Sequence, residues 1–164
     1  MNQNNAKANG AQPNGAAPVV PVFRCLGQAV RDLSMECPIA GWESQGQPQV
    51  DMNMGVGVVP RQGAEGVWDV TLSLRLRVEA DKKPQALLEL AYSGAFLLQH
   101  IPPEQHDMLL HVEAASLLYP FARQLVMTLL ADGGYRPPLL EPVSFMALYQ
   151  SRAVPATGQG QAAS

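Results

Sequence analysis

Apolar and polar residues alternate along the segment VWDVTLSLRLRVEA, residues 67–80. An alternation of period 2 over this length predicts a long β-strand that buries one face and exposes the other to water. The residues between the apolar positions are polar or charged. The predicted inward positions are Trp68, Val70, Leu72, Leu74, Leu76 and Val78.

Two further segments repeat the alternation, and short loops connect them to this strand. Residues 50–58 precede it across the loop PRQGAEG, and residues 85–96 follow it across the turn ADKKP. Such short connections predict antiparallel hairpins. The inward positions of the two strands are Val50, Met52, Met54, Val56, Val58, Ala86, Leu88, Leu90, Tyr92, Gly94 and Phe96.

The first strand, within residues 22–37, changes its phase. Leu33 and Met35 share one face, but Val30 before them has the opposite phase. One extra residue in a strand reverses the facing of every residue that follows it. The pattern therefore predicts a β-bulge between Val30 and Asp32.

The apolar period becomes helical after the segment IPPE. Residues from Glu104 to Ala131 predict a helix of roughly 40 Å, at ~1.5 Å per residue. Pro120 removes one backbone donor inside it and predicts a bend, and Gly133 or Gly134 is expected as its left-handed cap. The stripe assigned to the sheet is Met108, Leu109, Val112, Ala115, Tyr119, Ala122, Leu125, Val126 and Leu129.

A second, shorter helix is predicted with Ser144 as its N-cap and its end near Ala153. Four strands followed by helices predict an α+β fold, a four-stranded antiparallel sheet packed with one long and one short C-terminal helix. The long helix carries more apolar residues than these elements can cover, so we expect a homo-oligomer. The surplus residues are Leu110, Leu117, Leu118, Met127 and Leu130.

Length and composition predict one domain between two tails. A chain of 164 residues is long enough for one domain with a core. Residues 1–20 and 155–164 consist largely of Asn, Gln, Ala, Gly and other residues that bury little apolar surface, so both are expected to be disordered. The folded domain is predicted to span residues 21–154.

Charge and cysteine usage narrow the classes of partner. The 11 Lys and Arg residues are scattered and the net charge is −3, which argues against a nucleic-acid surface. Cys25 and Cys37 form no metal-binding motif, so we expect reduced thiols and neither a disulfide framework nor a zinc site. The N-terminus lacks the pattern of a secretory signal, and no run approaches the ~20 apolar residues that span a bilayer. We expect a cytoplasmic protein without membrane insertion.

Catalytic motifs are absent from the sequence. His100, His106 and His111 have spacings that do not stack two imidazoles on one helical face, as a zinc-binding HExxH motif does. No serine lies in a G-x-S-x-G motif, and the Gly-rich segments lack the frame of a phosphate loop. We predict no enzymatic activity and no metal or cofactor. A small-ligand-binding sheet domain remains an alternative, and it would require one enclosed pocket with convergent polar groups.

Two surfaces are candidates for partner binding. The alternation places Asp32, Glu36, Leu87 and Glu89 on the outward face of the sheet. Exposed carboxylates commonly only keep a protein soluble, but a leucine among them favours a basic, partly hydrophobic partner. The apolar segment LEPVSFMALYQ, residues 140–150, is either a helix that closes the core or part of a groove for apolar residues of another protein.

The chain also contains the segments VRDLSMECP, LLELAYSGAF, LLYPFARQLV and GGYRPPLLEPVSFMALY, within residues 22–149. Together with the order of strands and helices, they resemble the SecB family of bacterial protein-export chaperones. The resemblance implies a cytosolic, ATP-independent holdase that keeps precursor proteins unfolded and delivers them to the SecA motor of the Sec translocase. It also implies a homotetramer, a dimer of dimers with the long helices between the sheets.

The resemblance implies roles for individual residues. The SecA-binding surface would comprise Asp32, Glu36, Leu87 and Glu89, with the basic zinc-bearing tail of SecA as the partner. Arg75 and Arg77 depart from that pattern, because they add positive charge near this surface. An antitoxin-dedicated SecB-like chaperone is the alternative within the family. The client groove would comprise Trp42, Tyr135, Leu139, Leu140, Phe145, Met146 and Tyr149.

Overall fold

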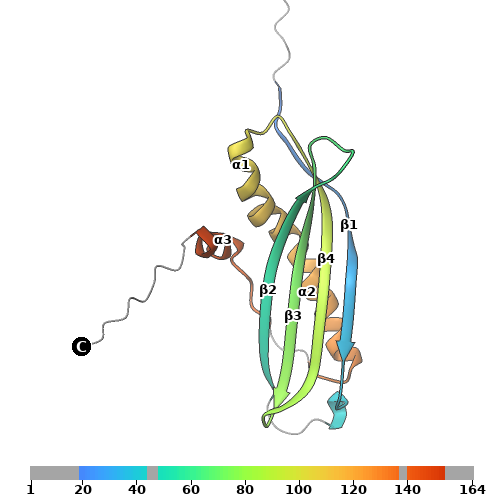
Figure 1. Ribbon diagram of the computed structural model, residues 1–164. Coiled ribbons are helices and arrows are strands. Elements are labelled where there is room, and N and C mark those ends of the chain that lie inside the picture. The colour runs from blue at the N-terminus through green and yellow to red at the C-terminus, as the bar shows by residue number, and fades with distance from the viewer. Residues whose placement is uncertain (1–18, 44–47, 137–139, 154–164) are drawn as a thin grey trace, which may run out of the picture.

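A four-stranded sheet and a long helix packed across one of its faces make up most of the chain (Figure 1). The computed structural model describes residues 19–43, 48–136 and 140–153. The predicted α+β class is confirmed, and the predicted tails lie almost wholly outside the described residues. The elements are β1 (Val22–Glu36), the 3-10 turn η1 (Gly41–Glu43), β2 (Gln49–Pro60), β3 (Val67–Ala80), β4 (Lys83–Gln99), α1 (Pro103–Met108), the π-helical segment η2 (Leu109–Ala114), α2 (Ala115–Asp132) and α3 (Phe145–Ala153).

The strands lie in the order β1-β4-β3-β2, and every neighbouring pair is antiparallel. The two predicted hairpins place β3 between β2 and β4. The turn between β3 and β4 has positive φ at Asp81 and Lys82, as the right-handed twist of a two-residue hairpin favours. The predicted inward residues of β3 and β4 are buried or partly buried, and those of β2 pack against the same core. The alternation therefore identified the buried face of all three strands.

β1 contains the predicted bulge. Its register with β4 shifts between Val30 and Asp32, and a second shift between Cys25 and Gly27 was not predicted. After the later shift Leu33 pairs with Leu90 on the helix-covered face. Asp32 consequently faces away from the helix, because neighbouring residues of a strand face opposite sides. The bulge thus determines which side chains of β1 reach the outer surface.

The helical region runs without interruption from Pro103 to Asp132 and continues through Pro120. Its buried face differs from the predicted stripe: Leu110, Leu118 and Leu130, assigned to the surplus, are fully buried, whereas Met108 is exposed. Adjacent apolar pairs at 109–110, 117–118 and 129–130 made the phase ambiguous. The π-helical turn η2 also alters the rotation of the residues that follow, because it is wider than an α-helical turn. Fewer apolar residues of this helix therefore remain exposed than the sequence predicted.

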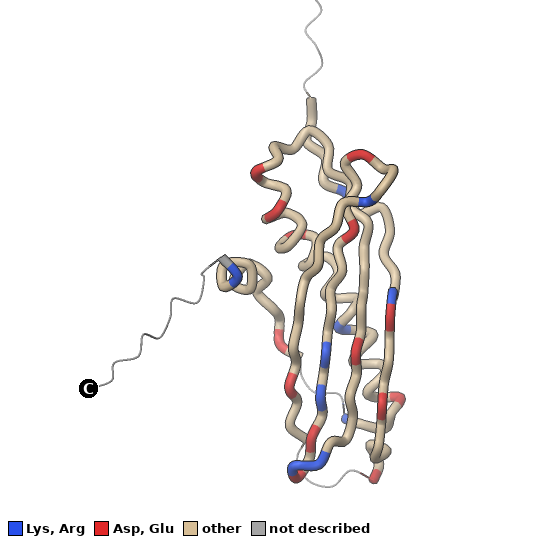
Figure 2. The backbone as a smooth tube through the Cα atoms, viewed as in Figure 1, with Lys and Arg blue, Asp and Glu red and all other residues tan. Residues whose placement is uncertain are grey.

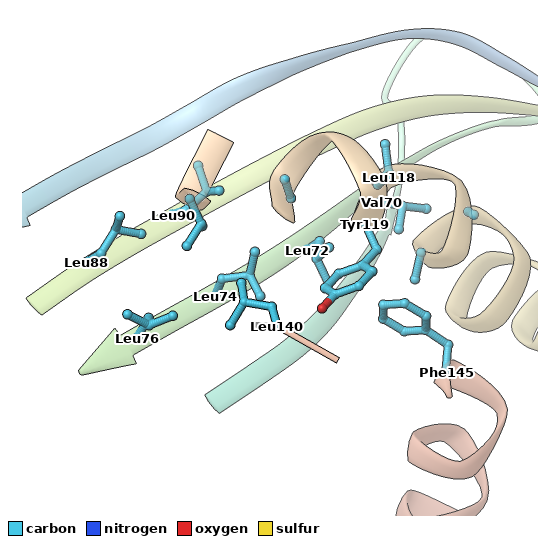
Figure 3. Packing of buried hydrophobic residues seen from close by; sticks show 14 of the residues in the cluster. Val70, Leu72, Leu74, Leu76, Leu88, Leu90, Leu118, Tyr119, Leu140 and Phe145 are labelled. Atoms are coloured by element: carbon cyan, nitrogen blue, oxygen red, sulfur yellow. The ribbon is translucent and has the colours of Figure 1, made fainter. Parts of the chain in front are cut away.

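Close approach of α2 to the sheet depends on Gly94. A Cβ atom at this position would lie 2.8 Å from Leu118 Cδ2, closer than side-chain atoms approach. The missing side chain lets Leu118 pack directly against β4. Figure 3 shows Leu118 with Val70, Leu72 and other residues of the central core.

The short helix α3 begins where the sequence predicted. Ala147 N donates a hydrogen bond to Ser144 Oγ at 3.2 Å, which confirms Ser144 as the N-cap. Phe145 packs edge-to-face on Tyr119 with the ring centroids 5.7 Å apart (Figure 3). Tyr119 Oη donates to the carbonyl oxygen of Glu141 at 3.0 Å, so the segment leading into α3 is attached to the long helix.

By length and composition alone, the helix from Pro103 to Asp132 is able to cross a membrane. However, 39% of its most apolar window is buried inside the chain. Because the core helix of a water-soluble protein meets the same criterion, this feature is weak evidence for membrane insertion. Cys25 on β1 and Cys37, directly after β1, are both exposed, although free cysteines are commonly buried.

Candidate functional site

The four residues predicted to bind SecA form one block on β1 and β4, which we call the acidic patch. Glu36 pairs directly with Leu87, and Glu89 pairs with Ser34, the residue between Glu36 and Asp32 on the outer face. The patch therefore covers two neighbouring strands, which lie ~5 Å apart. Along the strands it covers three successive outward positions, each ~7 Å from the next. None of its members is buried. A partner can reach its three carboxylates and the leucine from the same side.

Positive charge lies beside the acidic patch, on β3. Figure 2 shows two blue positions on β3 between red positions on the neighbouring strands. Arg75 lies opposite Glu89 in the register, with its Nε 3.3 Å from Glu89 Oε1. Arg77 pairs instead with Glu79 on its own strand, at 2.6 Å between Nη2 and Oε1. The two arginines thus have different acidic partners, and one of these belongs to the patch.

Two depressions in the outer sheet face meet at Arg75. The first has a volume of about 340 Å³ and is lined by Asp32, Glu89 and Arg75 among others. The second, of about 460 Å³, is lined by Glu36, Leu87 and Arg75 among others. Both mix charged and apolar groups, and this combination suits a long basic side chain whose methylene stem also makes contacts.

The residues predicted to form the client groove divide by burial. Tyr135, Leu140 and Phe145 are buried and belong to the main core. Tyr135 Oη shares its one proton between the carbonyl oxygens of Ile39 and, at 2.6 Å, Gln85. Burial raises the pKa of Tyr135 to about 12. We therefore assign these three residues to the core beneath the groove rather than to its surface, and Leu139 lies outside the described residues.

The accessible groove residues lie in two separate places. Trp42 is 77% exposed in η1, the cyan turn at the foot of β1 in Figure 1. Met146 and Tyr149 lie on α3, which lies beside β2 at the opposite edge of the sheet. In the described part of a single copy, Trp42 and the exposed residues of α3 therefore do not share one continuous trough.

The position of Trp42 depends on a crossing of two backbone segments. Gly41 N donates to the carbonyl oxygen of Gly133 at 3.0 Å, which fastens η1 to the end of α2. A Cβ atom on Gly41 would lie 2.1 Å from the carbonyl carbon of Gly134. Gly134 itself has φ of +81° and ends the helix as the left-handed residue. Only residues without side chains fit this crossing.

Replacement of Gly41 by Ala is expected to displace η1 and to destabilise the protein by about 1–3 kcal/mol, as overpacking does. Backbone atoms cannot rotate away from the new methyl group, so the loop must move and carry Trp42 with it. Chemical denaturation measures the first effect, and the fluorescence maximum of Trp42 in a Trp68→Phe background measures the second. Gly55→Ala is the control for the glycine-to-alanine change, since nothing lies within 4 Å of a Cβ atom there and its φ is not positive. An unchanged Trp42 spectrum in the Gly41→Ala variant would contradict the role given to the crossing.

Sequence reasoning missed a polar attachment between α3 and the long helix. Tyr149 Oη donates to Asp107 Oδ2 at 2.6 Å, and Asp107 Oδ1 lies 3.0 Å from His111 Nδ1. The hydrogen bond to Asp107 raises the pKa of Tyr149. Arg152 Nη2, also on α3, donates a hydrogen bond to the carbonyl oxygen of Val56 on β2 at 3.1 Å. No motif joins residues so far apart in sequence, so only the folded arrangement reveals the attachment.

A cavity of about 230 Å³ lies between α3, β2 and η2. Its lining mixes apolar groups with polar ones: Met54, Gly55, Val56, His111, Phe145, Leu148, Tyr149, Ser151 and Arg152. In the described part of the chain, no group of three or more His, Cys, Asp or Glu residues is arranged to hold a metal ion.

These features define a class of protein: an α+β protein whose candidate sites are surfaces of a sheet and of a short helix. The family model of the Preprotein translocase subunit SecB matches residues 16–155. The chain belongs to the SecB family.

Individual relatives agree with this family. Protein-export protein SecB of Hyphomonas neptunium is 39% identical over 132 residues, which cover 80% of this chain and 79% of that protein. Protein-export protein SecB of Bradyrhizobium diazoefficiens is 39% identical over 161 residues, 94% of this chain and 98% of that protein. The predicted resemblance to protein-export chaperones is thereby confirmed.

One solved structure has a similar fold. It is a SecB-like chaperone of Mycobacterium tuberculosis in complex with a ChAD peptide from the HigA1 antitoxin. The TM-score is 0.63 at 17% sequence identity, and the match covers 74% of this chain and 90% of that chain. At this identity the likeness concerns the fold.

Proposed function

We propose that this protein is a cytoplasmic, ATP-independent holdase that keeps precursor proteins unfolded and delivers them to the SecA motor of the Sec translocase. The observation that carries the proposal is the acidic patch, in which β1 and β4 bring Asp32, Glu36, Leu87 and Glu89 onto one outward surface. Membership of the SecB family supports the export role. The protein acts by binding alone and catalyses no reaction.

Client binding would use the separated apolar surfaces together. An extended chain covers ~3.3–3.6 Å per residue, so an unfolded client can reach both Trp42 and α3. Once one segment is bound, the next binding event has a high effective concentration, and weak contacts add up to strong binding. Aromatic and Met side chains contribute large, adaptable contact areas without selecting one sequence. Folded proteins present no such extended apolar segments and would be released.

Docking on SecA would use charge and an apolar contact at once. The three carboxylates of the patch attract Lys and Arg residues of the basic zinc-bearing tail of SecA, and Leu87 provides an apolar contact among them. Exposed charges chiefly accelerate association and are screened by salt. The complex should therefore form quickly and reversibly, as handover of a client requires.

We propose that the working assembly is a homotetramer, a dimer of dimers with the long helices between the sheets. β1 is an edge strand of 15 residues, and an edge strand presents unpaired backbone groups to a second copy. Its exposed apolar residues include Leu26, Val30 and Leu33. On α2, Leu117 and Phe121 are likewise exposed and lie one turn apart. A strand edge and a helix face offer two different interfaces, which is what a dimer of dimers needs.

The test of the proposed function combines Asp32→Ala with Glu89→Ala. The double variant is expected to bind purified SecA at least tenfold more weakly, because it removes two of the three carboxylates of the patch. Suppression of aggregation of an unfolded precursor, without ATP, should remain within about twofold of the wild type. Isothermal titration calorimetry and light scattering measure the two activities.

Glu65→Ala with Glu104→Ala is the matched control, since both carboxylates are exposed and lie outside the patch and outside both depressions. Equal SecA affinity in wild type and in Asp32→Ala with Glu89→Ala would contradict the docking site. A wild-type protein that holds clients but does not bind SecA would instead favour a chaperone dedicated to another pathway, such as an antitoxin.

A further inference from the structure

Arg75 stands at the centre of the outward sheet face, between the two depressions that contain the acidic patch. The first depression holds Asp32 and Glu89, the second holds Glu36 and Leu87, and Arg75 lines both. We infer that Arg75 is an intramolecular competitor: it pairs with Glu89 and lowers the affinity of the acidic patch for its basic partner. This inference rests on the proposed function, because it concerns the regulation of the same docking surface.

The register of the sheet makes the competition unavoidable. Arg75 on β3 is the direct cross-strand neighbour of Glu89 on β4, and both side chains face outward. Cross-strand neighbours have Cβ atoms ~4.5–5.5 Å apart, so the two charged groups remain within reach of each other. A cation of the partner that approaches Glu89 therefore meets a guanidinium group already in place.

The ion pair between Arg75 and Glu89 is weak enough for a basic partner to displace it. Arg75 contacts Glu89 through one pair of atoms, Nε and Oε1, at 3.3 Å. The side chains are 63% and 47% exposed, so water and salt weaken their attraction. An exposed pair of this kind changes an equilibrium by only a few-fold, and a partner with several basic residues can replace it. Arg75 therefore moderates docking and does not block it.

Arg77, the other arginine of β3, does not have the same effect on Glu89. Its closer contact is with Glu79, which is not a member of the patch. Arg77 also lines the second depression, opposite Leu87, but only Arg75 forms an ion pair with a carboxylate of the patch and so both neutralises that carboxylate and repels the incoming cation. Since these two contributions have the same sign, loss of the Arg75 charge should strengthen docking.

The experiment compares SecA binding by the wild type, Arg75→Gln, Arg75→Lys and Arg61→Gln in low and high salt. Arg75→Gln is expected to bind purified SecA about two- to fivefold more tightly in low salt, and the gain should shrink in high salt. Arg75→Lys should stay within about twofold of the wild type, because the positive charge remains. Arg61→Gln removes the same charge from an ion pair with Asp69 at the β2–β3 hairpin, and it should bind as the wild type does.

The outcomes separate this inference from the proposed function. Tighter binding by Arg75→Gln alone supports the competition. Unchanged or weaker binding by Arg75→Gln, while Asp32→Ala with Glu89→Ala loses SecA, overturns the competition and leaves the docking site standing. An equal gain in Arg61→Gln also overturns it, because net charge would then explain the effect. Absence of SecA binding by every variant overturns both proposals.

Discussion

Replacing Leu117 and Phe121 together by Glu is expected to halve the mass of the assembly in solution. The two side chains are 50% and 52% exposed, and their i, i+4 spacing places them on one face of α2. If the long helices pack between dimers, each substitution places a charge in an interface where water is excluded. Burial of an unpaired carboxylate costs several kcal/mol, enough to dissociate a tetramer into dimers. Sedimentation equilibrium or light scattering with mass determination measures the change.

Val59→Glu is the matched control for this experiment. Val59 is 57% exposed, so it resembles Leu117 in apolar character and accessibility, but it lies on the edge strand β2. The mass of this variant should equal that of the wild type. A wild-type protein with the mass of a monomer would end the oligomer proposal. A tetramer that survives both glutamates would show that this helix face is not the interface.

Replacing Phe145 by Ala is expected to lower the free energy of unfolding by about 3–5 kcal/mol. Phe145 is only 3% exposed and fills the space between α3 and Tyr119, so its loss creates a cavity in the core. Urea denaturation at a fixed protein concentration measures the loss, since the stability of an oligomer depends on concentration. The Phe145→Ala variant should also bind unfolded clients more weakly, but only because α3 no longer packs against the core.

Met146→Ala provides the comparison one residue along the same helix. Met146 is 38% exposed, and its truncation should cost less than about 1 kcal/mol of stability. If Met146 belongs to the client surface, this variant should hold an unfolded precursor several-fold more weakly while remaining as stable as the wild type. A stable Phe145→Ala variant with weakened client holding would contradict the division between core and surface. In that case Phe145 would be assigned to the client groove.

The outer face of the sheet was predictable because it depends on local periodicity. The alternation along β4 already places Leu87 and Glu89 on one side, whichever elements lie nearby. The phase change in β1 predicted the bulge before Asp32, and the register confirms it. Neither conclusion requires knowledge of which strand pairs with which. The side of the sheet on which a side chain lies follows from the backbone geometry of its strand.

The buried face of the long helix was not predictable in the same way. Where two leucines stand next to each other, as at 117 and 118, local sequence does not say which one meets the sheet. In the structure Leu118 meets it, because Gly94 opens space above β4 at this point. The choice therefore depends on a contact between residues distant in the chain. The same is true of Tyr135, which bonds to the carbonyl oxygens of Ile39 and Gln85.

The sequence by itself determined the strands, their inward faces, the order of the helices and the outward position of the acidic patch. Each of these depends on contacts or spacings within a few residues. The tertiary structure alone decided that Arg75 pairs with Glu89 and that Asp107 attaches α3 through Tyr149. It also decided that Trp42 and α3 lie at opposite edges of the sheet, beside β1 and β2 respectively. The physical reason is that register and packing bring together residues far apart in sequence, and no local pattern encodes which of them will meet.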